Sequence, residues 1–511
     1  TLFYIDTTLV DAIDLILPFT TLANGCYISM FYGCSSLVNA PALPATTLAT
    51  SCYDEMFSGC SSLTTAPALP ATTLANACYD RMFVNCTSLT TAPALPATTI
   101  SERCYYLMFS SCTALVNAPE TLPATTLADG CYEYMFNGCT SLTTAPALPA
   151  TTLADSCYKS MFEGCTALTT APATLPANTL QTECYYRMFL GCTALTTAPE
   201  LPATTLASYC YYGMLWNCTS LTTAPALPAT TLEYCCYQYM FDGCTSLTTA
   251  PELPATTLAN YCYESMFNGC NSLTTAPELP ATTLASYCYS YMFYNCTSLN
   301  EIHYGASVAP QDGYTNNWVS GVASNGTFYR TDESWTISYG VSNVPTGWTV
   351  VFDYQHKETD LCLTNLTDED NVFSCTYSIT NPTFYYETVS ESGATLSSGT
   401  TTASGTVTIP ARARLYLYTK NANWNTSSSY YCTLKCSKAF KASGNINSLV
   451  NYNTTISNTY EWQKLFYQST NLVDASELVL PFETLTNYCY YQMFYGCTSL
   501  TTAPALPPAT T

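Results

Sequence analysis

Cysteine is the residue type in this 511-residue chain with the most chemical potential, because its 29 copies recur at fixed spacing. Most of them form pairs eight residues apart, such as Cys26 and Cys34. Residues eight apart in a helix lie about 12 Å apart along the axis, whereas a disulfide requires Cα atoms within about 7 Å. We therefore expect two ladders of buried thiols that pack as small apolar groups, with disulfides or a metal as alternatives. In the first three repeats the expected core ladder comprises Cys26, Met30, Cys34, Cys52, Met56, Cys60, Cys78, Met82 and Cys86.

Four further cysteines, Cys362, Cys375, Cys432 and Cys436, lie outside this spacing. Core packing or a disulfide is favoured for them over a zinc site, because a short spacing typical of zinc ligands occurs only once among them. The acidic run 368–371 fits a solvated turn better than a calcium loop. We therefore expect neither a metal nor a cofactor.

Residues that could carry catalysis are sparse. The two histidines, His303 and His356, have no candidate nucleophile with an orienting carboxylate near them in sequence, which argues against a hydrolytic triad. The carboxylates vary in position between repeats, so a unique acid pair for glycoside cleavage is not indicated. Phosphate loops and dinucleotide fingerprints are absent from the sequence. We expect no enzymatic activity.

The charge of the chain excludes one class of partner. Its formal net charge is −22, from 13 basic and 35 acidic residues. A nucleic-acid binder needs clustered lysine and arginine to displace counterions, so nucleic acid is not an expected partner. No apolar run reaches the length of about 18 residues typical of a membrane span.

Tyrosine is the best candidate for binding, since 43 copies offer rings that stack on sugars or on partner chains. The positions that flank the variable part of the repeat favour a contact with a glycan or a protein, although these rings could also cover a face or pack between layers. The candidate contact residues are Tyr105, Tyr106, Tyr185, Tyr186, Tyr211 and Tyr212.

A repeat must position all these residues. The line C-Y-x-x-M-F-x-x-C-T-S-L-T-T-A-P-A-L-P-A-T-T-L-A recurs, and Met30, Met56 and Met82 give a period of 26 residues. Two copies carry one extra residue, Thr121 and Thr174, which suggests a bulge without a break in the stack. One such unit cannot bury its apolar stripe alone, but a stack of units can.

Each repeat is expected to contain a short helix and a short strand. In the copy that begins at Leu74, apolar residues at i, i+4 and i+8 (Leu74, Cys78 and Met82) indicate an amphipathic helix. Asn85, glycine in most copies, would end that helix. The segment 89–95 would then form a parallel strand that ends at a proline, although a proline in each layer removes a backbone donor from the sheet.

The M-F-x-G-C-T-S-L core followed by a short segment ending in proline resembles the BspA-like leucine-rich repeat family. The resemblance covers about residues 1–300 and 485–511, and similar threonine-, alanine- and proline-rich arrays are like those of gut bacteria and their phages. The chain departs from the family pattern by using alanine where larger aliphatic residues are common and by adding a second cysteine per repeat. The resemblance implies an α/β solenoid that acts in adhesion or fibre building.

Domain boundaries follow changes in the repeat. The opening Leu2–Ala12 is echoed by Leu465–Ala475, about 463 residues later, so the chain should hold one super-unit and the start of another, and the natural protein should continue. Alternating strand signals at 371–379, 383–389, 406–419 and 430–436 indicate a small all-β sandwich inserted between the arrays. The expected parts are 1–20, the end of an N-terminal cap; 21–300, a solenoid of about eleven units; 301–352, a C-terminal cap; 353–440, the sandwich; 441–484, the cap of the next solenoid; and 485–511, its first repeat.

Two functions are consistent with these features. The first is a structural or adhesive fibre that contacts itself or neighbouring fibre subunits. The second is a surface module that recognises a glycan or a host protein. Both place the protein outside a cell, on a bacterial surface or on a virion.

Overall fold

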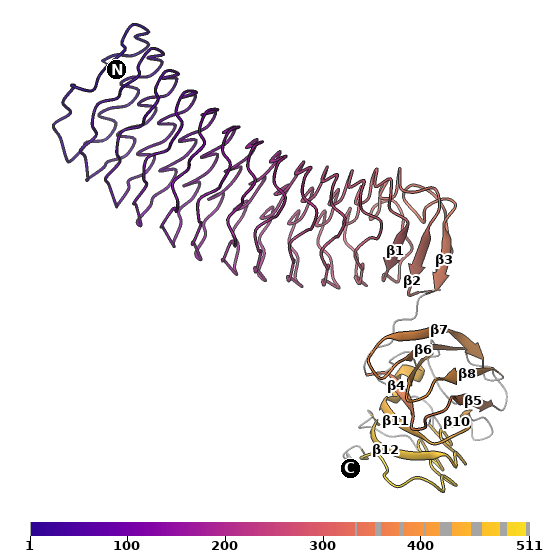
Figure 1. Cartoon of the computed structure of the whole chain (residues 1–511). Helices are drawn as coiled ribbons and strands as arrows, with labels where there is room; N and C mark the ends of the chain where they lie inside the picture. The colour runs from indigo at the N-terminus through magenta and orange to yellow at the C-terminus, as the bar shows by residue number, and fades with distance from the viewer. Residues whose placement is uncertain are drawn as a thin grey trace. The chain divides into compact units, whose positions relative to one another are not determined.

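The computed structural model describes residues 2–332, 335–352, 359–377, 383–402, 405–419, 432–450, 462–480 and 488–506. The predicted sandwich and the predicted cap of the second solenoid lie partly outside these ranges. The chain divides into two units, Thr1–Val351 and Phe352–Thr511. Each unit is described below on its own (Figure 1).

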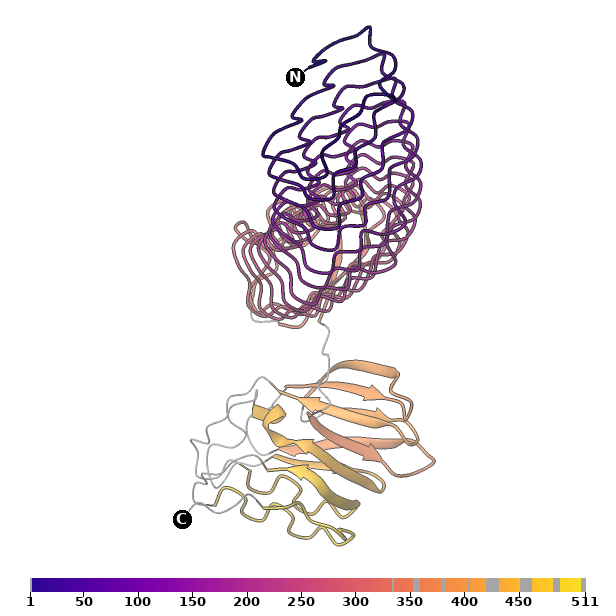
Figure 2. The ribbon, with the colours of Figure 1, turned by 90° about the vertical axis from the view of Figure 1, so that its left-hand side faces the viewer.

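The first unit is a stack of coils, which we call the array, with one repeat per layer (Figures 1 and 2). Its core runs through the whole unit, because each layer places tyrosine, methionine, phenylalanine and cysteine side chains inside. The phenylalanine rings of successive layers stack almost parallel, with Phe57 and Phe83 having ring centroids 5.6 Å apart. The two inserted residues leave the stack intact, since Thr121 and Thr174 form parallel bridges to the next layer.

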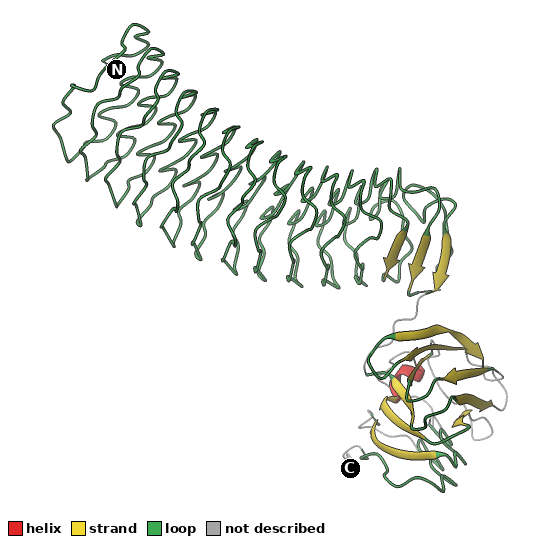
Figure 3. Ribbon diagram, in the orientation of Figure 1, coloured by secondary structure: helices red, strands yellow, loops and turns green. Residues whose placement is uncertain are grey.

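The predicted helix in each repeat is wrong: the segment is a run of overlapping turns (Figure 3). Backbone amides alternate between two kinds of partner. The Met56 amide donates within its own layer, to the Tyr53 carbonyl at 3.2 Å, whereas the next amide, Phe57, donates to the Met82 carbonyl in the following layer at 2.9 Å. Half of the donors that a helix would use internally therefore join neighbouring layers.

Left-handed backbone conformations explain how this segment turns. In each layer three residues spaced four apart have positive φ, for example Ala77 (51°), Arg81 (53°) and Asn85 (59°). A right-handed helix does not contain such residues, because a left-handed conformation costs an L-residue about 1–2 kcal/mol. The bonds between layers compensate this cost. The spacing at i, i+4 and i+8 thus reflects a turn that repeats every four residues.

The predicted strand also shrinks, to single parallel bridges between layers. Thr91 pairs with Asn117, and the pairing does not extend to Pro93. Proline has no amide hydrogen to donate, so a ladder cannot pass through it. A second bridge in many layers joins the threonines of the T-T-L segment, as between Thr73 and Thr99.

The last layers of the array hold true strands. β1 (Glu301–Tyr304), β2 (Thr327–Arg330) and β3 (Thr349–Phe352) form a three-stranded sheet in that order. The fully buried Trp318 lies where the ring ladders end, with its ring centroid 6.4 Å from that of Tyr289 and 6.0 Å from that of Phe293. Its indole nitrogen donates to the Asn343 carbonyl at 2.8 Å.

The second unit contains two sheets, one of strand order β10-β5-β8 and one of order β12-β11-β4-β9-β6-β7. The elements are β4 (Leu361–Asn365), β5 (Asn371–Tyr377), β6 (Thr383–Val389), β7 (Thr395–Thr402), β8 (Thr406–Ile409), β9 (Arg414–Tyr418), β10 (Cys432–Cys436), β11 (Phe440–Asn445), the 3-10 helix η1 (Ile446–Val450) and β12 (Leu472–Val479). Side chains from both sheets share one apolar cluster, with Leu363 of β4 and Phe373 of β5 among its members. We call β4 to η1 the β-module, and its assignment as a sandwich stays a prediction.

A second array begins at the end of the same unit. The Phe466 ring stacks on Phe494 at 5.7 Å between ring centroids, and Asp474 forms a parallel bridge to Thr502. β12 pairs in parallel with β11 of the β-module, so the first strand of this array is also an edge strand of the six-stranded sheet.

Candidate interaction surface

Three of the six predicted contact tyrosines cannot reach a partner, because Tyr105, Tyr185 and Tyr211 are at most 2% exposed. They belong to a ladder formed by the first tyrosine of each C-Y pair, in which Tyr185 and Tyr211 stack with centroids 5.6 Å apart. Burial raises the pKa of these phenols well above the usual range. The prediction that they are exposed is wrong, because the turn directs the residue after each cysteine inward.

The other three predicted tyrosines, Tyr106, Tyr186 and Tyr212, are half-buried and lie on the outside of the turn segment. Tyr186 and Tyr212 come from successive layers and stack face to face at 4.6 Å. Tyr106 lies apart from them, beneath the Arg103 guanidinium, which is 4.0 Å from the ring centroid. The structure thus joins two of the predicted residues and separates the third.

Tyr186 and Tyr212 are part of a larger group that we call the aromatic patch. Ring contacts, one within a layer and the others between neighbouring layers, connect all its members at centroid distances of 4.6–5.9 Å. The patch comprises Tyr186, Tyr209, Tyr212, Trp216, Tyr234, Tyr239, Tyr261 and Tyr287. Six of these were not predicted. The sequence did indicate these residues, because aromatic side chains cluster at the variable positions of neighbouring repeats. These positions lie just before the first cysteine of a repeat, and between its conserved tyrosine and its second cysteine.

Arg187 supplies positive charge to the aromatic patch. Its guanidinium carbon lies 5.1 Å from the Tyr186 ring centroid, 5.6 Å from that of Tyr212 and 5.5 Å from that of Trp216. A cation held against several ring faces is a favourable electrostatic arrangement. Rings beside one fixed cation form a surface that can stack on a sugar ring or on an aromatic or acidic side chain of a protein.

Charged side chains occupy the same face at the other end of the array. Arg81 forms ion pairs with Asp54 at 3.3 Å, Glu55 at 3.0 Å and Asp80 at 3.0 Å. Burial raises the pKa of Asp80 to about 6, although Arg81 and Arg103 act against this rise. The pairs with Asp54 and Glu55 join successive layers, so the charges on this part of the face are paired within the array.

The second cysteine of each repeat makes a specific contact inside the stack. The Cys60 thiol donates to the Phe31 carbonyl in the preceding layer at 3.1 Å, and the same bond recurs along the ladder, with Cys86 and Phe57 at 3.2 Å. Burial raises the pKa of Cys60 to about 12. These thiols therefore stay protonated and unreactive at neutral pH.

One residue of the predicted core ladder is not in the core. Cys26 is exposed, because it belongs to the first full turn segment and has no complete layer before it. The remaining predicted members are all buried, namely Met30, Cys34, Cys52, Met56, Cys60, Cys78, Met82 and Cys86. The only disulfide among the described residues joins Cys375 and Cys432 in the β-module.

Comparison with protein families identifies the family to which the repeats of the array belong. The BspA type leucine rich repeat region matches in six copies, at residues 27–117, 107–222 and 204–312. The chain belongs to this family. BspA-type repeats form a non-catalytic scaffold for protein interaction and are typically surface-associated. Comparison with curated proteins and with solved structures gave no match.

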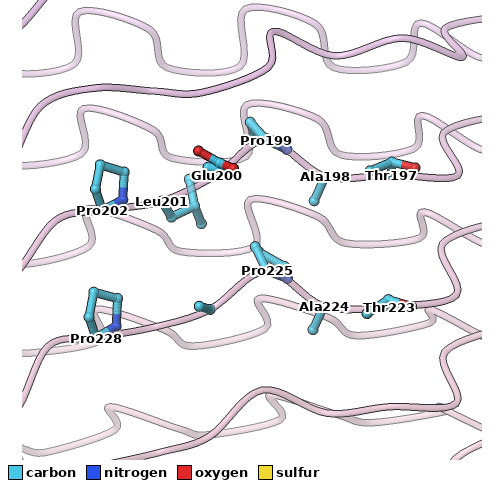
Figure 4. Close-up of a pocket in the computed structure, with 11 residues that line it drawn as sticks. Thr197, Ala198, Pro199, Glu200, Leu201, Pro202, Thr223, Ala224, Pro225 and Pro228 are labelled. Atoms are coloured by element: carbon cyan, nitrogen blue, oxygen red, sulfur yellow. The ribbon is translucent and has the colours of Figure 1, made fainter.

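The face of the BspA-type array that carries the prolines holds shallow grooves (Figure 4). One groove of about 430 Å³ lies between the T-A-P-x-L-P segments of two successive layers, with Pro199 and Pro225 at equivalent positions. A similar groove of about 330 Å³ lies nearer the start of the array, beside Pro96 and Pro119. Because these grooves repeat with the layers, they reflect the stacking and do not form a unique active-site cavity.

Chemistry beyond binding finds little support in the described part of this BspA-type chain. Within those residues, no group of three or more histidine, cysteine or acidic side chains is arranged to hold a metal ion. His303 lies against two carboxylates, Glu301 at 2.9 Å and Glu278 at 3.4 Å, and against the Tyr329 ring. His356 lies outside the described residues. No helix in the described ranges is both long and apolar enough to cross a membrane.

Proposed function

We propose that this protein is a structural and adhesive filament protein, displayed outside a cell on a bacterial surface or a virion. The array acts as a stiff spacer in it. The observation that carries this proposal is the continuity of the stack, since each layer is covered by its neighbours through rings, thiols and backbone bonds. A quasi-one-dimensional structure of this kind gains length without needing a larger core.

The recurrence of the array start also supports a filament. The contact between Phe3 and Phe31 that opens the first array has a counterpart 463 residues later, between Phe466 and Phe494. A chain that alternates arrays with β-modules is suited to spanning a distance and to carrying modules along it. Its partners would be neighbouring filament subunits or further copies of itself.

Immunogold electron microscopy on native cells or particles tests this proposal. An antibody against the aromatic patch should label extended filaments at regular intervals along their length. Labels confined to the cell interior, or scattered over a smooth surface without filaments, would reject the filament function. An antibody against the β-module should give a second regular series of labels on the same filaments.

The aromatic patch favours a second candidate function, recognition of a glycan or a host protein. Eight connected rings, three of them in contact with Arg187, concentrate aromatic surface in one region of the array. Stacking against a ligand is the role to which such rings are suited. In this reading the array displays the patch, and the filament brings it to the ligand.

A glycan array probed with the purified full chain tests this candidate. Replacement of Trp216 and Tyr239 by serine should abolish any binding observed. The matched control is Tyr106→Ser, because Tyr106 is an equally half-buried tyrosine of the same face outside the patch. Equal binding by both variants, or no binding by the unmodified chain to any glycan or host-surface extract, would exclude the patch as a binding site.

A further inference from the structure

The first layer of the array presents an apolar edge that is exposed to solvent. Leu2 is 72% exposed, Val10 55% and Ile16 81%, although the array buries leucine and methionine almost completely elsewhere. The following layer contacts this one, through the Phe3 ring on Phe31 and a parallel bridge from Asp11. Exposed aliphatic side chains beside a half-paired backbone mark an interaction surface.

The same first layer occurs again in the second unit, in the same register. Phe466 stacks on the next layer as Phe3 does, and the Cys497 thiol donates to the Phe466 carbonyl at 2.9 Å. In the first array the Cys34 thiol donates to the Phe3 carbonyl at the same distance, 2.9 Å. The segment L-V-D-A is identical in both layers, at 9–12 and 472–475. The two layers are therefore versions of one structural element.

In the second unit the β-module covers this layer. The β11 strand pairs with β12 in parallel, with Phe440 opposite Leu472 and Asn445 opposite Val479. β10 contributes as well, since the Leu434 amide donates to the Leu465 carbonyl at 2.8 Å. The result is an eight-residue strand where the first array has only an isolated bridge.

Burial changes accordingly between equivalent positions. Leu465 is fully buried, whereas its equivalent Leu2 is 72% exposed. Val479 is 47% exposed, compared with 81% for its equivalent Ile16. The buried position thus belongs to the layer that pairs with β11 and β10, and burial follows these contacts.

Charge complementarity points to the same occupant. Lys441 of β11 forms ion pairs with Glu477 at 2.5 Å and with Asp474 at 3.8 Å. The equivalents of these two acids in the first array are Asp14 and Asp11, and no ion pair to either is found among the residues that the structure describes.

We propose that the edge formed by Leu2 and residues 9–16 is the docking surface for a β-module of the same kind as Leu361–Val450. That module adds its last strand in parallel and places a lysine between Asp11 and Asp14. The β11 edge of this chain is already paired with β12, so an unmodified second copy has no equivalent strand to offer. This inference deepens the filament proposal and rests on it, because it specifies the joint between successive super-units.

Hydrogen exchange of the full chain with an added module tests the joint. Residues 353–464 are placed directly before Leu2, which reproduces the connection that precedes Leu465. Within 9–16 the amides of Leu9, Ala12, Ile13 and Leu15 already donate hydrogen bonds. Exchange of the remaining amides in this range should slow by at least about tenfold, because added strand pairing protects amides that were open to water. The amides of 472–479 serve as the internal reference and should already exchange slowly in the unmodified chain.

The matched control carries Lys441→Glu in the added module alone, which puts like charges opposite Asp11 and Asp14 and should remove most of the protection. The same substitution in the resident module of the unmodified chain should speed exchange at residues 472–479, which tests the joint even where the added module does not fold. Unchanged exchange at residues 9–16 beside a folded added module overturns the proposal. Slow exchange there in the unmodified chain, together with a dimer in sedimentation, would assign the edge to a second copy instead. The filament proposal is judged separately, by imaging.

Discussion

Each buried thiol of the second cysteine ladder completes the hydrogen bonding of a phenylalanine carbonyl. The Phe31 carbonyl accepts from the Cys34 amide at 3.1 Å and also from the Cys60 thiol at 3.1 Å. A cysteine fits this role because it is small and apolar but carries a weak donor. The regular spacing of the cysteines thus reflects a packing requirement of each layer.

Thiol labelling provides the first prediction. In the native protein at pH 8, a maleimide should modify the exposed Cys26 rapidly and the ladder thiols slowly, since burial raises the pKa of Cys60 and Cys165 to about 12. Mass spectrometry of labelled peptides over time measures both rates. Denatured protein, in which all free thiols should react alike, is the control. Rapid labelling of Cys165 in the native protein would show that the ladder thiols are accessible to solvent, which would contradict the prediction.

A buried carboxyl leads to the second prediction. Burial raises the pKa of Asp242 to about 6, and the Asn268 amide, which donates to it at 3.0 Å, offsets only part of the rise. The folded protein then holds this proton more tightly than the unfolded chain does, so the contribution to stability is present below pH 4 and is lost as the pH rises through 6.

Asp242→Asn should therefore stabilise the array by about 1–3 kcal/mol at pH 7.5 and leave it unchanged at pH 4, since each pKa unit corresponds to about 1.4 kcal/mol. Urea unfolding at the two pH values measures the difference. An equal change in the free energy of unfolding at both pH values would contradict a raised pKa for Asp242. Asp129→Asn, at an exposed site, is the matched control.

The turn segment determines the structure at the scale of the element. Every fourth residue of its backbone is left-handed, and Gly213 has φ +54° at the position where Arg187 has φ +50°. Alanine is the best helix former and glycine a poor one, whereas the left-handed region favours glycine. Substitutions between these two residues therefore distinguish a turn from a helix by the sign of their effect.

The third prediction uses the sign of the stability change when alanine and glycine are exchanged in the turn segment. Gly213→Ala should destabilise the array by about 1 kcal/mol and Ala77→Gly should stabilise it or leave it unchanged, because both positions have positive φ. A helix would give the opposite signs by a similar amount. Thermal unfolding of the two variants measures this. Stabilisation by Gly213→Ala would restore the helical interpretation.

The sequence predicted the parts of the fold that depend on the apolar period. The repeat length, the inward Cys, Met and Leu positions apart from Cys26, and the unbroken stack at Thr121 and Thr174 are confirmed. The helix was wrong because a turn of four residues and a helix of 3.6 place nearly the same side chains inside over nine residues. Only bonds to the next layer distinguish the two, and one repeat does not reveal them.

Among the strands of the second unit, β5, β6, β8, β9 and β10 lie within the predicted stretches, while β4, β7, β11 and β12 were not predicted. The segment of β7, T-L-S-S-G-T-T-T, has the composition of a linker and becomes a strand through its pairing with β6. Half of the contact tyrosines were misplaced for a related reason. In a helix, adjacent tyrosines such as Tyr185 and Tyr186 both flank the inner face, whereas in the turn the first points inward and the second outward.

At the scale of the whole molecule, the ends of the array decide its stability. Layers in the middle are covered on both sides, while an end layer depends on a special element. Trp318 is that element at one end, since it lies against the last tyrosine and the last phenylalanine of the ladders. Terminal elements of this kind protect a repeat stack from opening layer by layer.

The fourth prediction concerns the loss of this terminal protection. Trp318→Ala should lower the stability of the last layers by about 3–5 kcal/mol, as expected for deletion of a fully buried indole. Hydrogen exchange should speed up in the last layers, near Tyr289 and Phe293, and stay unchanged near Phe57. Uniform acceleration along the array would mean that the array unfolds as one cooperative unit. Trp335→Ala, which removes a partly buried indole outside the ladders, is the control.

The near identity of the layers has a consequence for how the gene can change. A cut at the same repeat position in two layers, rejoined with 26 residues missing or duplicated, recreates the ring stack, the thiol bond and the threonine bridge at the junction. Unequal recombination between the repeat units can therefore shorten or lengthen the protein in whole steps while the fold is retained. Populations carrying this gene should differ in allele length long before they differ in architecture.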